Sequence, residues 1–156
     1  MDSYSLIKAL HIISSAVLFG TGAGIAFFML MGCRSADFAA RRFAAGMTVK
    51  ADFLFTLPAA IVQPLTGFWM VWTAGFVWTE LWLVTSYALY ALAALCWFPV
   101  VALQIGMKRM LDEQARSQAF DQPAFDRCFR WWFALGWPAF GGLVVVFWLM
   151  VTKPTW

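Results

Sequence analysis

The chain has 156 residues, of which 63% are hydrophobic and only 12% are charged, whereas a soluble domain has about 25% charged residues. This composition excludes a soluble globular domain, because too few polar side chains are present to cover its surface. The net charge of +3 does not indicate nucleic-acid binding, since the basic residues cluster beside apolar segments, where they set the orientation of a membrane protein.

Four apolar segments follow one another along the chain, over about residues 6–31, 53–75, 81–107 and 129–151. Each is longer than the ~20 residues that a helix needs to cross a bilayer. Because the backbone groups of a segment in lipid must bond to one another, each segment is predicted to be a helix. The sequence therefore predicts one all-α domain over residues 1–156, a bundle of four transmembrane helices whose first partner is the lipid bilayer.

The sequences of the connections between these segments also predict local structure. Residues 35–38 (Ser-Ala-Asp-Phe) can cap a short interfacial helix. The connection over residues 75–80 is short, which predicts a tight antiparallel hairpin of the second and third spans. Residues 108–116 are expected to continue the third helix beyond the membrane, and residues 121–123 (Asp-Gln-Pro) predict the start of the fourth helix.

The basic residues are distributed asymmetrically. Nine of the eleven Lys and Arg side chains lie in the first and third connections, and only Lys8 and Lys153 lie at the other ends of the spans. Cytoplasmic loops of membrane proteins are enriched in Lys and Arg. This pattern predicts a multi-pass protein of the bacterial inner (cytoplasmic) membrane with both termini in the periplasm.

His11 is the single histidine of the chain, and it lies within the first span, roughly 7 Å from its outer end by helical rise. Ionisable side chains at such depth are costly and are often functional. Two interpretations remain open: a neutral imidazole hydrogen-bonded across the bundle, or a ligand of haem iron. Gly22 shares the face of His11, where it allows close approach of a flat ligand or another helix. Ser14, Ser15 or a residue of the third or fourth span is expected to contact the second ring nitrogen.

Five further residues are candidates for the same cofactor site. Met70 and Met150 lie near the outer ends of their spans and are candidates for the second axial ligand, although methionine is also common core filler. Ser86 and Tyr87 lie at a similar level and can bond either to a propionate or to a neighbouring helix. Lys8 can reach the aqueous interface or pair with a propionate.

Other small and polar residues in the spans are expected to serve the structure. Ala16, Gly20 and Gly24 form a run of small residues that permits close helix contact, either within the bundle or in a dimer. Gln63 is expected to form an interhelical hydrogen bond rather than to contact a ligand. Asp52 lies at the end of a span and is expected to anchor it at the interface.

Several stretches resemble a small bacterial family of four-span integral membrane proteins of unknown function. The resemblance rests on residues 6–15, 65–69, 127–140 and 149–154 and extends over nearly the whole chain. The layout is more distantly similar to HemJ-type protoporphyrinogen oxidases and CopD-type copper-resistance membrane proteins. The shared elements are Lys-x-x-His in the first helix, Thr-Gly in the second and a closing Lys-Pro.

The similarity to HemJ-type proteins implies haem b at His11. A lysine of the third helix in that family has no counterpart, because Thr85 and Ser86 occupy the region, and the Asn-Glu pair before the fourth-helix proline is replaced by Gly136 and Trp137. The resemblance therefore implies a haem-binding redox protein, and whether it is an enzyme stays open. The alternative is a non-catalytic membrane subunit or scaffold without a cofactor, which pairs with a second copy or with another membrane protein.

Overall fold

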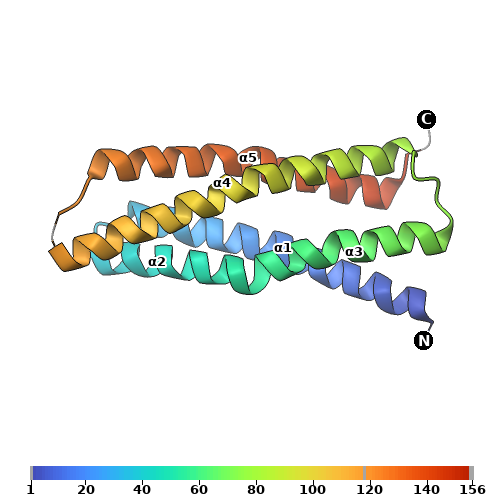
Figure 1. Cartoon of the computed structure of the whole chain (residues 1–156), viewed down its shortest axis with the longest axis horizontal. Helices are drawn as coiled ribbons and strands as arrows, with labels where there is room; N and C mark the ends of the chain where they lie inside the picture. Colours follow the sequence, from blue (N-terminus) through green and yellow to red (C-terminus); the bar gives the residue numbers. More distant parts are fainter. Residues whose placement is uncertain (1, 118, 155–156) are drawn as a thin grey trace.

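The computed structural model describes residues 2–117 and 119–154, all in helices and short connections (Figure 1). The elements are α1 (Ser3–Arg34), α2 (Phe38–Ala51), η1 (Asp52–Thr56), α3 (Leu57–Ala74), α4 (Leu81–Ser117) and α5 (Gln122–Thr152). The segments α2, η1 and α3 form one continuous helical rod. Within the described residues, four helices are long and apolar enough to cross a membrane. This confirms the predicted all-α bundle of four transmembrane helices.

The ends of the helices follow from local side-chain chemistry. The carboxylates of Asp2, Asp37 and Asp121 each accept a hydrogen bond from a backbone N–H in the first turn that follows. These bonds satisfy donors that a helix start leaves without partners. Gly75 ends α3 with a φ of 71°, a left-handed conformation that glycine adopts without strain. The expected helix start at residues 121–123 is thus confirmed. The connection after Gly75 is short, but the expected tight hairpin of the second and third spans is wrong, because α4 packs mainly against α5 and α3 mainly against α1.

The first connection differs from the expected short interfacial helix. The helix α2 has 14 residues and continues through η1 into α3, so the helix that contains the second apolar segment begins well before residue 53. It packs against α1 and α4 rather than lying free at an interface. Gly32 of α1 allows this packing, because a Cβ atom there would collide with the Cβ of Ala44. The prediction failed because the polar residues of α2 mark a helix that extends the bundle.

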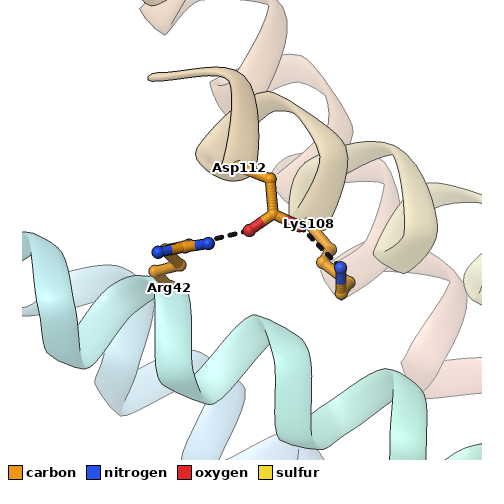
Figure 2. Close-up of polar contacts among 3 residues, drawn as sticks. All are labelled: Arg42, Lys108 and Asp112. Atoms are coloured by element: carbon orange, nitrogen blue, oxygen red, sulfur yellow. Dashed lines mark hydrogen bonds and ion pairs between the residues drawn. The ribbon is translucent and has the colours of Figure 1, made fainter. Parts of the chain in front are cut away.

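An ion-pair network joins the first and third connections (Figure 2). The Arg42 Nε of α2 lies 2.7 Å from the Asp112 Oδ1 of α4, and the Lys108 Nζ lies 2.6 Å from Asp112 Oδ2. The third helix does continue beyond residue 107, as expected, and it ends at Ser117. The two basic connections therefore lie at the same end of the bundle.

The core is concentrated at the two ends of the bundle. At the end that holds the ion pairs, the buried residues are Met29, Ala45, Met107, Leu111, Phe125 and Trp132. At the other end, the buried residues are Val71, Trp82, Leu83 and Leu149. In the projection of Figure 1, α1 diverges from α4 and α5 toward its N-terminus, while α4 crosses α5 near the middle of the bundle. The pair of α4 and α5 has the most extensive packing. The residues between the two clusters surround a cavity.

The outer surface of the bundle is apolar. Phe28, Leu95 and Val151 are 66%, 69% and 84% exposed, and similar side chains occur on all four long helices. A soluble protein rarely exposes apolar patches of this extent. In a bilayer, these side chains contact the lipid tails, which is the environment that the composition predicts.

Candidate functional site

His11 contacts α3 through the hydroxyl group of Thr66. The His11 Nδ1 atom lies 2.8 Å from Thr66 Oγ1. The same hydroxyl donates to the carbonyl oxygen of Val62 at 2.7 Å and lies 3.1 Å from that of Gln63. A hydroxyl group has one proton, and because that proton points at a carbonyl, the oxygen accepts a hydrogen bond from Nδ1–H. The Nε2 atom of His11 is then the unprotonated nitrogen.

The backbone of His11 is also tied to α3. The side-chain amide of Gln63 donates to the His11 carbonyl oxygen at 3.2 Å, and the Ser14 hydroxyl donates to the same oxygen at 3.1 Å. Gln63 is therefore an interhelical hydrogen-bond donor, as expected. Together with Thr66, it fixes both the imidazole ring and the turn of α1 that carries it.

Gly67 leaves space for the imidazole ring of His11, because it has no side chain. A Cβ atom at Gly67 would lie 3.3 Å from the Cε1 atom of His11, closer than most such contacts. The adjacent Thr66 supplies the hydrogen bond and Gly67 supplies the space, so the Thr-Gly pair forms one side of the histidine site. Both residues belong to α3, next to Pro64, which lies inside the helix.

Sequence reasoning placed the second contact of His11 on the wrong helix. The hydroxyl of Ser14 donates to the backbone of its own helix, and that of Ser15 donates to the Ile12 carbonyl oxygen. The actual partner, Thr66, comes from the second span. The sequence did contain one indication of this partner. The Thr-Gly pair and the Lys-x-x-His segment are both among the elements shared with HemJ-type and CopD-type proteins, so a contact between them could have been considered.

The other proposed cofactor residues are dispersed. The Ser86 hydroxyl donates to the carbonyl oxygen of Trp82 in its own helix at 2.6 Å. Tyr87 and Met150 pack against the core at the end opposite the ion pairs. Met70 of α3 is half-buried. Lys8 is exposed one turn before His11. In the described residues, none of these side chains forms a hydrogen bond with His11.

Gly22 is approached by a helix. A Cβ atom at Gly22 would lie 3.2 Å from the Cζ atom of Phe140 in α5. Of the two interpretations of this glycine, the geometry favours close contact with another helix. The run of Ala16, Gly20 and Gly24 behaves differently, because nothing lies within 4 Å of a Cβ built on either glycine. The expectation that this run packs within the bundle is therefore wrong, and its alternative, an intermolecular contact, stays a prediction.

Comparison with protein families identifies the group to which the chain belongs. Residues 5–154 match a family described as "Predicted integral membrane protein (DUF2269)". The chain belongs to this family. The matched region of the DUF2269 chain includes His11 and the Thr66–Gly67 pair, and it confirms the expected resemblance to a four-span membrane family. No curated protein and no solved structure matches the chain significantly.

The DUF2269 chain has a second concentration of polar atoms, inside the bundle. Asp52 is only 2% exposed and lines the cavity between the helices together with Thr56, Trp97 and Gln104. The expectation that Asp52 anchors a span at the interface is therefore wrong. The prediction failed because the rod formed by α2 and α3 extends beyond the apolar segment, which places residue 52 inside the packed bundle.

A metal site built from several protein ligands is not seen in residues 2–117 and 119–154. No three His, Cys, Asp or Glu side chains of this region lie close enough together to hold an ion. The three cysteines are free thiols. In the described structure, His11 thus has the geometry of a single ligand with one helix partner.

Proposed function

We propose that this protein binds haem b, with His11 Nε2 as an axial ligand of the iron, and that it has a redox role in the bacterial inner membrane. The observation that carries the proposal is the hydrogen bond from His11 Nδ1 to Thr66. Histidines that ligate metals usually donate their other ring N–H to an oxygen acceptor, which fixes the tautomer and the ring orientation. The Thr66 hydroxyl occupies that position.

A second argument comes from the resemblance to HemJ-type and CopD-type membrane proteins. Two of the shared elements, Lys8-x-x-His11 and Thr66-Gly67, are distant in sequence and adjacent in space. The third, Lys153-Pro154, lies elsewhere, with the Lys153 Nζ atom 4.6 Å from the centre of the Phe76 ring. The first two elements therefore support the proposal of a common site. The third element lies at the other end of the sequence and contacts Phe76 at the end of the bundle opposite the ion pairs.

The residues around His11 fit one face of a haem. A neutral imidazole that is protonated at Nδ1 is a suitable proximal ligand through Nε2, and a bound haem would supply one-electron chemistry. The other face has no assigned ligand from this chain, since Met150 packs between α3, α4 and α5. We propose that Lys8, one turn from His11 and exposed, pairs with a propionate.

The orientation is part of the proposal. The basic residues of the first and third connections support a cytoplasmic location for the end that holds the Arg42–Asp112 ion pair. The N-terminus of α1 and the C-terminus of α5 would then lie on the periplasmic side. His11 would lie in the outer leaflet.

The test is the absorbance of the purified protein after expression with ample haem. We expect a Soret band in the native protein and loss of most of it in His11→Ala, with helical content unchanged by circular dichroism. Met150→Leu serves as the matched control and should keep the band. Equal haem content in His11→Ala would contradict the assignment, and a native protein without a Soret band would contradict haem binding altogether.

The second candidate function is a non-catalytic subunit that packs against a second copy or another membrane protein. Ala16 and Gly20 are exposed and, with Gly24, present a surface of small residues that no helix of the same chain covers. Such runs commonly mediate close helix contact in membranes. Gly20→Leu should dissociate the oligomer in crosslinking experiments without changing the stability of the monomer. An unchanged crosslinking pattern would exclude this surface.

A further inference from the structure

A cavity of about 310 Å³ lies between the helices, separate from His11. All four long helical rods contribute to its wall. Along α4, the wall extends from Tyr90 to Gln104, which corresponds to about 21 Å of helical rise, so the cavity is elongated. Its volume falls in the range of small-molecule sites. It is lined mainly by apolar side chains, among them Trp97, Trp132, Trp137 and Phe140.

One end of the cavity carries polar atoms without partners. Asp52 Oδ2, Thr56 Oγ1 and Gln104 Oε1 are buried and have no hydrogen-bond partner in the described structure. The three side chains are 2%, 5% and 2% exposed, and Thr56, Trp97 and Gln104 surround the carboxyl group of Asp52. Buried acceptors without partners are costly, and native proteins retain few of them.

The Asp52 carboxyl group also lacks a counter-ion from the chain. In the described residues, the ion pairs that involve Arg42 and Lys108 go to Asp112. The Trp97 Nε1 atom lies 3.5 Å from Asp52 Oδ1, and Thr56 and Gln104 are the other polar side chains beside the carboxyl group. Lys50, the basic residue closest in sequence, is exposed. A buried carboxylate is stable only when it is paired or hydrogen-bonded. A cation or a strong donor bound at this position would supply such a partner.

The backbone presents these groups through an unusual segment. Asp52 and Thr56 are the first and last residues of the π-helical segment η1, whose wider turn is closed by the Leu57 N–H donating to the Asp52 carbonyl oxygen. Single π-helical turns within α-helices occur frequently at functional sites. Here the π-helical turn places both polar side chains inside the bundle.

The opposite end of the cavity needs no polar partner. The Tyr90 hydroxyl donates to the Ala60 carbonyl oxygen at 2.7 Å, so it is already satisfied. Gln104 lies one helical turn before Lys108, whose ammonium group pairs with Asp112 at the cytoplasmic end of the bundle in our proposed orientation. An occupant thus has a polar head near that end and an apolar body that extends toward the middle of the membrane.

We propose that this cavity binds a lipophilic amine, with its ammonium head at Asp52 and its apolar body between the aromatic side chains. A primary ammonium group has three N–H donors, and the buried oxygens of Asp52, Thr56 and Gln104 at this end can accept hydrogen bonds from them. The positive charge compensates that of the Asp52 carboxylate, and the nearby indole rings attract cations through their π-electrons. The proposal is independent of haem binding at His11.

The experiment measures quenching of tryptophan fluorescence in phosphatidylcholine nanodiscs by a bromine-tagged long-chain primary amine. Trp97, Trp132 and Trp137 line the cavity, so an occupant brings bromine next to them. The corresponding alcohol and carboxylate serve as probes without a positive charge, and empty nanodiscs measure partitioning into lipid. We expect saturable quenching by the amine and at least about tenfold weaker binding of the carboxylate, from the worth of a hydrogen bond to a charged group.

The variants distinguish the contribution of the Asp52 charge from that of the cavity volume. Asp52→Asn keeps the acceptor for Trp97 and should weaken amine binding about tenfold while changing alcohol binding little. Ala94→Leu, which narrows the cavity, should weaken both probes. Glu113→Gln removes an exposed carboxylate outside the cavity and should change neither. Unchanged amine affinity in Asp52→Asn, or equal affinity of the native protein for the amine and the carboxylate, would overturn the proposal.

Discussion

The Nδ1 atom of His11 donates to the hydroxyl of Thr66 at 2.8 Å, which joins residues 55 positions apart in the sequence. The Thr66 hydroxyl in turn donates a hydrogen bond to the Val62 carbonyl oxygen. This chain of two hydrogen bonds sets which ring nitrogen is protonated. The state of the single histidine is thus determined by a residue on a different span.

Thr66→Val should disturb this histidine without unfolding the bundle. The valine has nearly the same shape but no acceptor, so the Nδ1–H loses its partner. An interhelical hydrogen bond in a membrane contributes about 1 kcal/mol, and we expect a loss of stability of this order. Haem affinity should fall about 10–100-fold, as for other residues that support a metal ligand. Haem titration of the apoprotein measures the second effect.

Thr66→Ser is the matched control for that prediction, because serine keeps the hydroxyl group. We expect it to retain most of the haem affinity of the native protein. If serine and valine at position 66 weaken binding equally, the packing of the threonine methyl group matters rather than its hydrogen bond.

Alanine at three glycines should change the thermal stability in a graded order. A Cβ atom at Gly32 would collide with Ala44, one at Gly67 would lie 3.3 Å from His11, and one at Gly106 would have nothing within 4 Å. Alanine favours a helix by up to about 1 kcal/mol over glycine. Gly106→Ala should therefore keep or raise the melting temperature, Gly67→Ala should lower it, and Gly32→Ala should lower it most. A different order in thermal scans would contradict the helix contacts described here.

Single cysteines in a cysteine-free variant should report the orientation. Ala36→Cys and Ala115→Cys lie at the end that holds the basic connections, and Thr79→Cys lies at the opposite end; all three positions are exposed. In intact cells, a membrane-impermeant maleimide should label only Thr79→Cys. Labelling of the other two positions from outside would reverse the proposed topology.

The contact between Arg42 and Asp112 should be energetically small but measurable. Both are partly exposed, at 49% and 19% of their side-chain areas, and such pairs contribute about 0.2–1 kcal/mol. A double-mutant cycle of Arg42→Ala and Asp112→Ala, measured by thermal unfolding, should give a coupling in this range that decreases with salt. Additive effects of the two substitutions would show that the pair does not stabilise the bundle.

The transmembrane helices could be predicted from the sequence because each is a long apolar segment, and composition alone decides that property. The extent of α2 could not, since Arg41, Arg42 and Lys50 suggested a surface element. In the structure, these residues lie on a helix whose other face packs against α1 and α4. Packing partners outside the segment decide such cases, and a single sequence does not contain them.

The candidate site was predictable only in part. His11 stood out because an ionisable residue in a span is rare, and Gln63 and the Thr66–Gly67 pair were noted without being connected to it. Their connection depends on how α1 is rotated against α3, which periodicity does not determine. The buried position of Asp52 also depends on a π-helical turn, and no sequence pattern of this chain predicted one.

The π-helical turn has a consequence for the angular relationship between the two ends of the rod formed by α2 and α3. An α-helix advances about 100° per residue, so the additional residue held in the segment Asp52–Thr56 shifts the two halves relative to each other by about that angle. Only with this shift does Arg42 face Asp112 while Thr66 faces His11. Removal of one residue from the segment would leave both halves helical but out of phase, so that one of the two contacts could form only at the expense of the other.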